Sequence, residues 1–263
     1  MIRVNDVLCY FEKLAPIQMK LDFDNVGLLV GDGSAEVRRV LVALDVTDDV
    51  IDEAIDLEAE LIVAHHPIIL EPLKRVTDGD RVGRKILKLA RHEIAAICMH
   101  TNLDAAAGGI NDVLAERLGL SGTVVLWKTG EMNGVSYGLG RVGTLPHALS
   151  MADFMPEIKR ALDTSGLRYH DAGRPVHKVA VMGGSGGDAL PMAVAAGCDT
   201  YVLGEAKYHA FVEARELGIN LIEADHYCTE NVISTPLQQV LRAALPGLDV
   251  MVSERHDQVV RFF

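Results

Sequence analysis

Two adjacent histidines raise the question of chemistry in this 263-residue chain. His65 and His66 follow the apolar run "LIVA" at residues 61–64 and precede Pro67. Side chains alternate in direction along an extended chain, so these two imidazoles point to different sides. Two diverging imidazoles do not easily bind one metal ion, but each can bind one of two neighbouring ions. The alternative is a pair of ordinary histidines, one buried and one exposed.

Polar side chains follow three further apolar segments of the chain. They are His100, Asn102 and Asp104 after residues 95–99, Glu205, Lys207 and His209 after residues 200–203, and His226 and Glu230 after residues 220–224. Ligands of open α/β sheets gather at the carboxyl ends of the strands. Neutral imidazole nitrogens and carboxylate oxygens suit a divalent metal ion. The pattern therefore predicts a dinuclear metal centre, in which His226 and Glu230 share a face of one helical turn.

These residues need a scaffold of alternating strands and helices. We expect strands over residues 39–44, 61–64, 95–99, 178–182, 200–203 and 220–224, and helices over residues 47–57, 81–92, 188–196 and 206–217. The alternation is typical of parallel or mostly parallel sheets with covering helices. The predicted fold class is α/β: two linked α/β domains with mixed, mostly parallel sheets, and a metal site at the carboxyl ends of strands between them.

The middle of the chain differs in composition and pattern from the segments on either side. Residues 123–145 contain short β-type pieces and many glycines, and residues 150–162 predict a helix in which Pro156 should cause a kink or shift the start. We therefore predict one α/β domain from residues 1–125 plus 227–263, and an inserted second domain from residues 126–226. The β-α-β order before and after the middle indicates either a weak internal duplication or two generic β-α-β units.

Composition limits the classes of function. Hydrophobic residues make up 49% of the chain, which allows a sizeable core, and no apolar run reaches the roughly 18 residues of a membrane helix. The polar N-terminus is not typical of a signal peptide, so we expect a cytoplasmic protein without membrane association. None of the four cysteines is part of a C-x-x-C motif, so we expect free buried thiols. The net charge of −12 disfavours nucleic-acid binding.

Several motifs resemble one family along nearly the whole chain. They are "DFDNVGLLVGD" at residues 22–32, "AHHP", "MHTNLDAAAGGIND", "GGSGGD", "LGEAKYH" and "GINLIEADHYCTE", in this order. Together they resemble the NGG-interacting-factor-three-like family, also labelled dinuclear metal centre proteins or GTP cyclohydrolase I type 2 homologues. The sequence departs from the family at Asp225, where a glycine is expected, and at Glu205, where aspartate is also common.

The resemblance implies a ligand set and an assembly. It implies that His66 and Asp104 bind one ion, that His65 and His226 bind the other, and that Glu230 bridges both. With Asp104 and Glu230 ionised, two divalent ions leave a local charge of +4 − 2 = +2 in an acidic protein. The metal itself, Zn, Fe, Mn or Co, stays open. The resemblance also implies a homohexamer built as a trimer of dimers.

Two classes of function follow. The first is a metal-dependent hydrolase for a small anionic substrate, phosphate-bearing or nucleotide-like; the family label implies opening of a purine imidazole ring. The second is a non-catalytic metal-binding helper or regulatory scaffold. Supporting or catalytic candidates are His100, Asn102, Glu205, Lys207 and His209. The "GGSGGD" stretch either offers amides to a phosphate or forms a tight turn between a strand and a helix.

Overall fold

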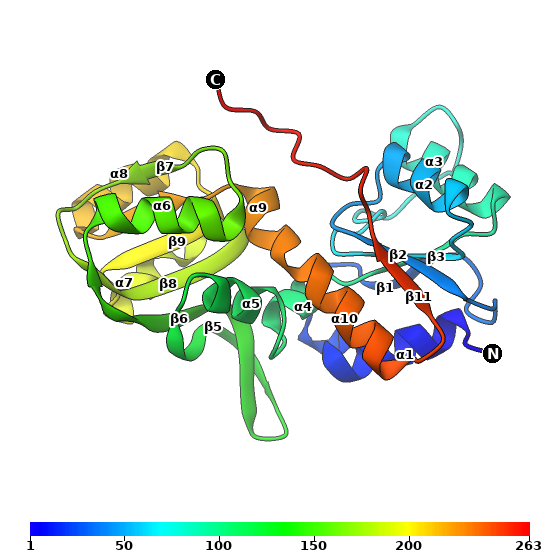
Figure 1. Cartoon of the computed structure of the whole chain (residues 1–263), viewed down its shortest axis with the longest axis horizontal. Coiled ribbons are helices and arrows are strands. Elements are labelled where there is room, and N and C mark those ends of the chain that lie inside the picture. The colour runs from blue at the N-terminus through cyan, green and yellow to red at the C-terminus, as the bar shows by residue number, and fades with distance from the viewer. The chain divides into compact units, whose positions relative to one another are not determined.

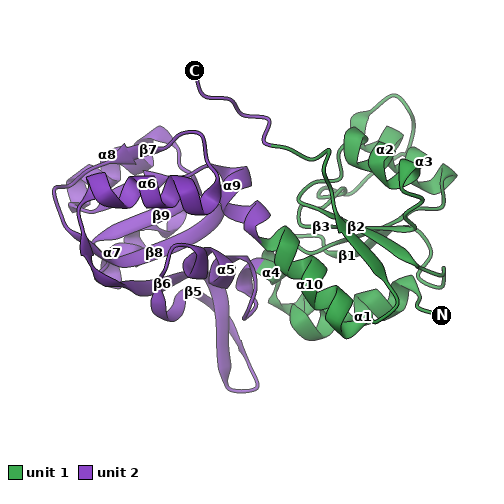
Figure 2. Ribbon diagram, in the orientation of Figure 1, with its two compact units in different colours: residues 1–103, 233–257 green, residues 104–232, 258–263 purple.

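The computed structural model describes residues 1–263 and divides into two compact units (Figure 2). Unit 1 consists of residues 1–103 and 233–257, and unit 2 of residues 104–232 and 258–263. These boundaries differ from the expected 125/126 and 226/227. The reason lies in the core of unit 2, where Leu114 and Cys228 pack with Val179 and Val202 of the second sheet. The helices that flank the expected insertion therefore cover that sheet.

Unit 1 contains a five-stranded sheet in the order β1-β4-β3-β2-β11 (Figure 1). Its strands are β1 Gly27–Val30, β2 Arg39–Ala43, β3 Leu61–Ala64, β4 Ala95–Cys98 and β11 Asp249–Val252. Strands β4, β3, β2 and β11 run parallel, and β1 pairs antiparallel with β4. All residues of β3 and β4 are buried, as expected for apolar strands covered on both faces. The carboxyl ends of β2, β3 and β4 therefore meet at one edge.

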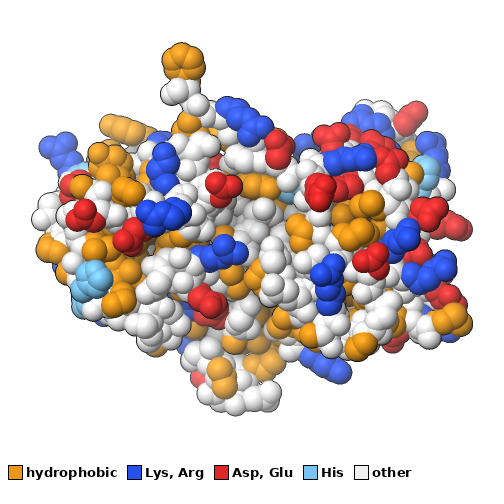
Figure 3. Space-filling model, in the orientation of Figure 1, with side chains coloured by type: hydrophobic (Ala, Val, Ile, Leu, Met, Phe, Trp, Pro, Cys, Tyr) orange, Lys and Arg blue, Asp and Glu red, His pale blue; other side chains and the backbone are white.

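Helices cover both faces of this sheet (Figure 1). Helices α2 Asp48–Asp56 and α3 Arg81–Arg91 lie on one face, and α1 Val4–Leu14 and α10 Ser234–Ala244 on the other. The side chains of Thr47 and Asp80 cap α2 and α3 by accepting from backbone amides three residues ahead. An ion pair of 2.7 Å joins Lys88 of α3 to Asp52 of α2. Figure 3 accordingly shows acidic and basic side chains interspersed over this part of unit 1.

Unit 2 contains a six-stranded mixed sheet in the order β5-β6-β8-β9-β10-β7. Its strands are β5 Ser121–Met132, β6 Val135–Leu149, β7 Arg168–His170, β8 Val176–Ser185, β9 Thr200–Glu205 and β10 Asn220–Glu223. The central β8, β9 and β10 run parallel, and the outer strands pair antiparallel. Asn133 and Gly134 have positive φ, which suits the tight turn of the β5–β6 hairpin.

The helices of unit 2 also lie on two faces of their sheet. Helices α5 Ile110–Arg117, α6 Met151–Leu162 and α9 His226–Glu230 pack into one apolar core. The turn η2 Gly187–Ala189, α7 Leu190–Ala195 and α8 Tyr208–Leu217 pack into the other. Pro156 does not shift the start of α6, because Ser150 caps this helix by accepting from the amide of Asp153 at 3.2 Å. Three short elements complete the chain: η1 Ile17–Met19, α4 Thr101–Ala105 and, after α9, η3 Asn231–Ile233.

The structure confirms two α/β units with mixed sheets. Both units contain a β-α-β-α-β run, with the parallel strands ordered β4-β3-β2 in one and β10-β9-β8 in the other. All four cysteines are free, but only three are buried, since Cys9 is exposed. Burial raises the pKa of the Cys98 thiol to about 12, so this thiol stays protonated at neutral pH. None of the helices is long and apolar enough to span a membrane.

Candidate metal centre

Three imidazoles cluster at the carboxyl edge of the sheet in unit 1. His65 and His66 directly follow β3, and His100 follows β4. The ring centroid of His65 lies 4.9 Å from that of His66 and 5.1 Å from that of His100. The potential ligand nitrogens of all three lie within 4.8 Å of one another. The strand-end expectation is thus met in unit 1, and we call these residues the histidine cluster.

Each ring of the histidine cluster has its Nδ1 engaged by an acceptor. Nδ1 of His65 lies 2.8 Å from the carbonyl oxygen of Met99. Nδ1 of His66 lies 2.9 Å from Oδ1 of Asp45, and Nδ1 of His100 lies 2.9 Å from Oδ1 of Asp24. An acceptor at Nδ1 favours the tautomer that has its lone pair on Nε2. Metal-binding histidines in proteins show this arrangement, because it fixes the ring and raises the basicity of the ligand.

The two supporting carboxylates are themselves held ionised. Burial on its own raises the pKa of Asp24, but hydrogen bonds from His100 and Thr101 outweigh it and bring this pKa to about 2. Burial acts in the same direction on Asp45, and hydrogen bonds from His256 and His66 hold its pKa well below the usual range. Both carboxylates are therefore anionic at neutral pH and act as permanent acceptors for the imidazoles.

Unit 2 contains a second group of possible ligands, two of which lie on the short helix α9. His226 and Glu230 lie one helical turn apart, as predicted, and Nε2 of His226 is 3.1 Å from Oε2 of Glu230. Two ligands of one ion with bonds of about 2.1 Å are separated by about 3 Å, so this spacing suits a shared metal. Ligand oxygens of Asp104 and Glu230 also lie within 4.8 Å of each other. We call Asp104, His226 and Glu230 the α9 ligand group.

Glu205 supports this group instead of standing apart from it. Its Oε2 lies 3.1 Å from Nδ1 of His226, which is the same carboxylate–imidazole pairing as in the histidine cluster. Glu205 ends β9, the strand next to β10, so neighbouring strand ends bring the two side chains together. The structure thus gives this catalytic candidate a positioning contact with His226.

Glycines make room for the carboxylate of Glu230. Gly184 has φ +63°, and a Cβ built there would lie 2.0 Å from Oε1 of Glu230 and 3.2 Å from Nε2 of His226. The amide of Gly184 donates to Oγ1 of Thr229 at 3.2 Å, and the amide of Gly183 donates to Oδ1 of Asn111 at 3.0 Å. These two amides of the "GGSGGD" stretch therefore hold protein side chains. The close approach of α9 to β8 accounts for Gly184, and α9 together with Ile110 of α5 accounts for Gly183.

The residues present fit a divalent metal site. Four imidazoles have Nδ1 next to an acceptor, two carboxylates can supply hard oxygens, and Gly184 leaves a space beside two of the ligands. This donor set suits Zn, Fe, Mn and Co alike.

Lys207 and His209 line a separate small cavity in unit 2. Its volume is about 50 Å³, and its other lining residues are Ser185, Gly187, Asp188, Glu205 and Ala210. Both Lys207 and His209 are exposed. The remaining candidate, Asn102, is buried and has a structural contact: its Nδ2 donates to the carbonyl oxygen of Ala15 at 2.7 Å. This contact gives Asn102 a structural role that explains its position without a catalytic one, whereas Lys207 and His209 stay catalytic candidates.

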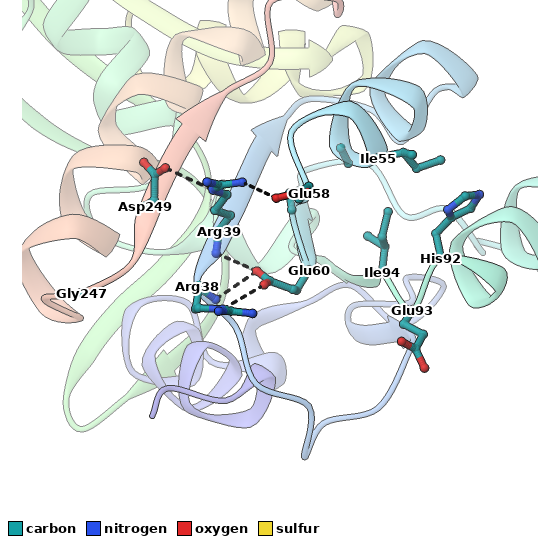
Figure 4. Close-up of a pocket in the computed structure, with 12 residues that line it drawn as sticks. Arg38, Arg39, Ile55, Glu58, Glu60, His92, Glu93, Ile94, Gly247 and Asp249 are labelled. Carbon is teal, nitrogen blue, oxygen red and sulfur yellow. Dashed lines mark hydrogen bonds and ion pairs between the residues drawn. The ribbon is translucent and has the colours of Figure 1, made fainter.

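A pocket of about 730 Å³ lies at the other edge of the sheet in unit 1 (Figure 4). Its lining includes Arg39 and Asp249, which begin β2 and β11, and Glu60, which precedes β3. Arg39 pairs with Glu58 at 3.2 Å and with Asp249 at 3.7 Å. The charged lining residues are two arginines and four carboxylates, and the pocket lies at the amino ends of the strands whose carboxyl ends carry the histidine cluster.

Sequence reasoning missed the residues that orient the possible ligands. Asp45 lies two residues after the end of β2, so the rule that located His65 and His100 near strand ends would also have located Asp45. Asp24 lies in a loop before β1, and no local pattern links it to His100, which is 76 residues away in the sequence. His256 lies near the C-terminus, where its Nε2 is 3.2 Å from Oδ2 of Asp45. Only the folded chain reveals these last two contacts.

The fold and the site define the class: a protein of two α/β units with histidines and carboxylates that could hold a metal ion. The family described as Duf34/NIF3 (NGG1p interacting factor 3) matches residues 2–258, and the chain belongs to this family. Curated relatives include two proteins with the name GTP cyclohydrolase 1 type 2 homolog. The one from Clostridium perfringens is 35% identical over 87% of each chain, and the one from Clostridium acetobutylicum is 34% identical over 99% of each.

Solved structures share the fold over the full chain. Staphylococcus aureus protein SA1388 has a TM-score of 0.91 and 27% identity, and covers 100% of this chain and 99% of its own. A Bacillus cereus protein related to NIF3 has a TM-score of 0.90, 26% identity and the same coverage. Reduced HcgD from Methanocaldococcus jannaschii has a TM-score of 0.81 and 26% identity, with 96% and 98% covered.

Proposed function

We propose that this protein binds two divalent metal ions and acts as a metal-dependent hydrolase. The ligands in this proposal are His65 and His66 of unit 1 and Asp104, His226 and Glu230 of unit 2. The observation that carries it is that the Nδ1 atom of each imidazole lies next to an oxygen acceptor, which leaves Nε2 for a metal. The names of the curated relatives support a nucleotide-like, anionic substrate.

The side chains around the ligands have their own tasks in this proposal. Bound divalent ions would supply Lewis acidity, which lowers the pKa of a water and stabilises a developing oxyanion. Asp45 and Glu205 orient His66 and His226. His100, paired with the ionised Asp24, lies 5.1 Å from His65 between ring centroids and can hold or deliver a proton at its Nε2. Lys207 offers a positive charge to an anionic substrate.

A screen for turnover tests the hydrolase. Purified protein is loaded with Mn²⁺, Fe²⁺, Co²⁺ or Zn²⁺ and incubated with nucleotides and phosphoesters. We expect hydrolysis that Asp104→Ala reduces to below about 1% of wild type, because even residues that only support a ligand affect activity about 10- to 100-fold. His147→Ala, at an exposed position of β6, is the matched control and should keep full activity.

The second candidate function is a metal-binding helper without turnover. In that case no substrate of the screen is hydrolysed, and the loaded protein instead transfers its metal to a chelating acceptor.

The homohexamer stays a prediction; light scattering of the native protein tests it against a mass of about six chains of 28.5 kDa each.

A further inference from the structure

The C-terminal segment, residues 253–262, contacts the support of a possible ligand in each unit. It follows β11 without a helix or strand of its own (Figure 1). His256 belongs to unit 1 and Gln258, two residues later, belongs to unit 2. Each of them contacts an aspartate that supports one of the proposed ligands, and neither was singled out in the sequence.

In unit 1 the contact runs through Asp45. Nε2 of His256 lies 3.2 Å from Oδ2 of Asp45, while the other oxygen of this carboxylate lies 2.9 Å from Nδ1 of His66. The side chain of His256 is only 8% exposed. Because one carboxylate connects the two rings, His256 limits the movement of the group that orients His66.

The segment is fixed in this place by a buried carboxylate of α2. Glu53 accepts from the hydroxyl of Ser253 and from the amides of Glu254 at 2.8 Å and Arg255 at 3.3 Å. Arg255 also donates to Asp56 at 2.5 Å. Glu53 is 5% exposed, so these donors stabilise a carboxylate that is largely removed from water. The position of His256 is therefore determined by several contacts of its neighbours.

In unit 2 the contact runs through Asp225. Nε2 of Gln258 donates to Oδ1 of Asp225, which also accepts from the amide of Cys228 at 3.1 Å and so caps α9. Asp225 has φ +76° and ψ 135°, a conformation that favours glycine. This explains why a glycine was expected here. Phe262 lies against Gly166, where an added Cβ would be 2.4 Å from its ring.

We propose that the C-terminal segment is a positioning element for the ligands of both units. His256 holds Asp45, which orients His66. Gln258 holds the strained Asp225, which caps the helix that carries His226 and Glu230. This inference rests on the proposed metal binding. Asp225 adopts the backbone conformation for which a glycine was expected before His226, and Gln258 of the C-terminal segment is the partner that holds its side chain.

Metal titration of the full-length protein tests this role. We compare His256→Ala and Gln258→Ala with wild type, using Co²⁺ as the probe in calorimetry of metal-free protein. Each variant should weaken the binding of Co²⁺ by about 10- to 100-fold, which is the usual effect of residues that support a ligand. His256→Gln keeps a donor near the place of Nε2 and should restore most of the affinity. His147→Ala and Val259→Ala, both at exposed positions, are the controls.

Two readouts on metal-free protein separate this inference from the proposed function. In His256→Ala, ¹⁵N NMR should show that the tautomer of His66 becomes mixed. In Gln258→Ala, the amide of Cys228 should exchange hydrogen faster than in wild type. If wild type binds no Co²⁺ but both shifts occur, the proposed function fails and the positioning role stands. If wild type binds Co²⁺ and neither variant changes affinity, tautomer or exchange, the positioning role is overturned.

Discussion

Single residues determine the geometry around Glu230. Gly184 is the clearest case, because its missing side chain leaves the space that a carboxylate oxygen of Glu230 occupies. The sequence shows a glycine-rich stretch there but shows neither the φ angle nor the neighbour. Consequently the two interpretations of "GGSGGD" stayed open until the structure placed the amides of Gly183 and Gly184 on Asn111 and Thr229.

Gly184→Ala should weaken metal binding. The added methyl group would lie 2.0 Å from Oε1 of Glu230, so the carboxylate must move. We expect calorimetry to show a loss of at least about 10-fold in Co²⁺ affinity, comparable to the loss of a supporting residue. Gly173→Ala is the matched control, since Gly173 has φ +73° and no atom within 4 Å of an added Cβ. Equal affinities of the two variants would show that the space beside Glu230 is unimportant.

At the scale of elements, strand bounds were easier to predict than assignments of helices to sheets. Strand β3 was predicted with its observed ends, Leu61–Ala64, because a continuous apolar run bounded by polar residues is a strong signal. Helices α5 and α9 are short, and their sequences do not tell which sheet they cover. Their apolar residues pack into the core of unit 2, which moves the boundaries between the units away from the expected positions.

Asp24 illustrates how a loop fixes an element next to the histidine cluster. It accepts from the amide of Thr101 at 2.9 Å and from the Thr101 hydroxyl at 2.5 Å, and so anchors the start of α4. Its pKa is lowered from 3.8 to about 2 in the folded protein. Its ionised form therefore adds about 2 kcal/mol of stability above pH ~4, and this contribution disappears as the pH falls through ~2.

Asp24→Asn should reduce the free energy of unfolding at neutral pH by roughly that amount. The difference between wild type and variant should shrink as the pH is lowered from 4 towards 2, because protonation of Asp24 removes the same charge. Urea unfolding of metal-free protein at pH 7, 4 and 3 measures it. A constant difference at all three values would mean that the charge of Asp24 is not what stabilises α4.

For the whole molecule, the chain passes through the two units in an interleaved order, and the proposed ligands are distributed over both. Unit 1 is formed by residues 1–103 and 233–257, and the α9 ligand group comes from the residues in between. The five proposed ligands stay a prediction: their positions after strands and one helical turn apart indicated a metal site, and the full set came from the resemblance to the family. The contacts of His256 and Gln258 could not be predicted, because they join residues far apart in the sequence through no periodic pattern.

The most direct test of the central claim is a metal titration of wild type, His66→Ala and Glu230→Ala after reconstitution of metal-free protein. Wild type should bind two divalent ions per chain. His66→Ala should lose one ion and keep the other, because His66 is assigned to one ion alone. Glu230→Ala removes the proposed bridging charge and leaves two dications to repel each other, so both should be lost together. Wild type that binds one ion or none, or Glu230→Ala that binds two with near-native affinity, would contradict the account.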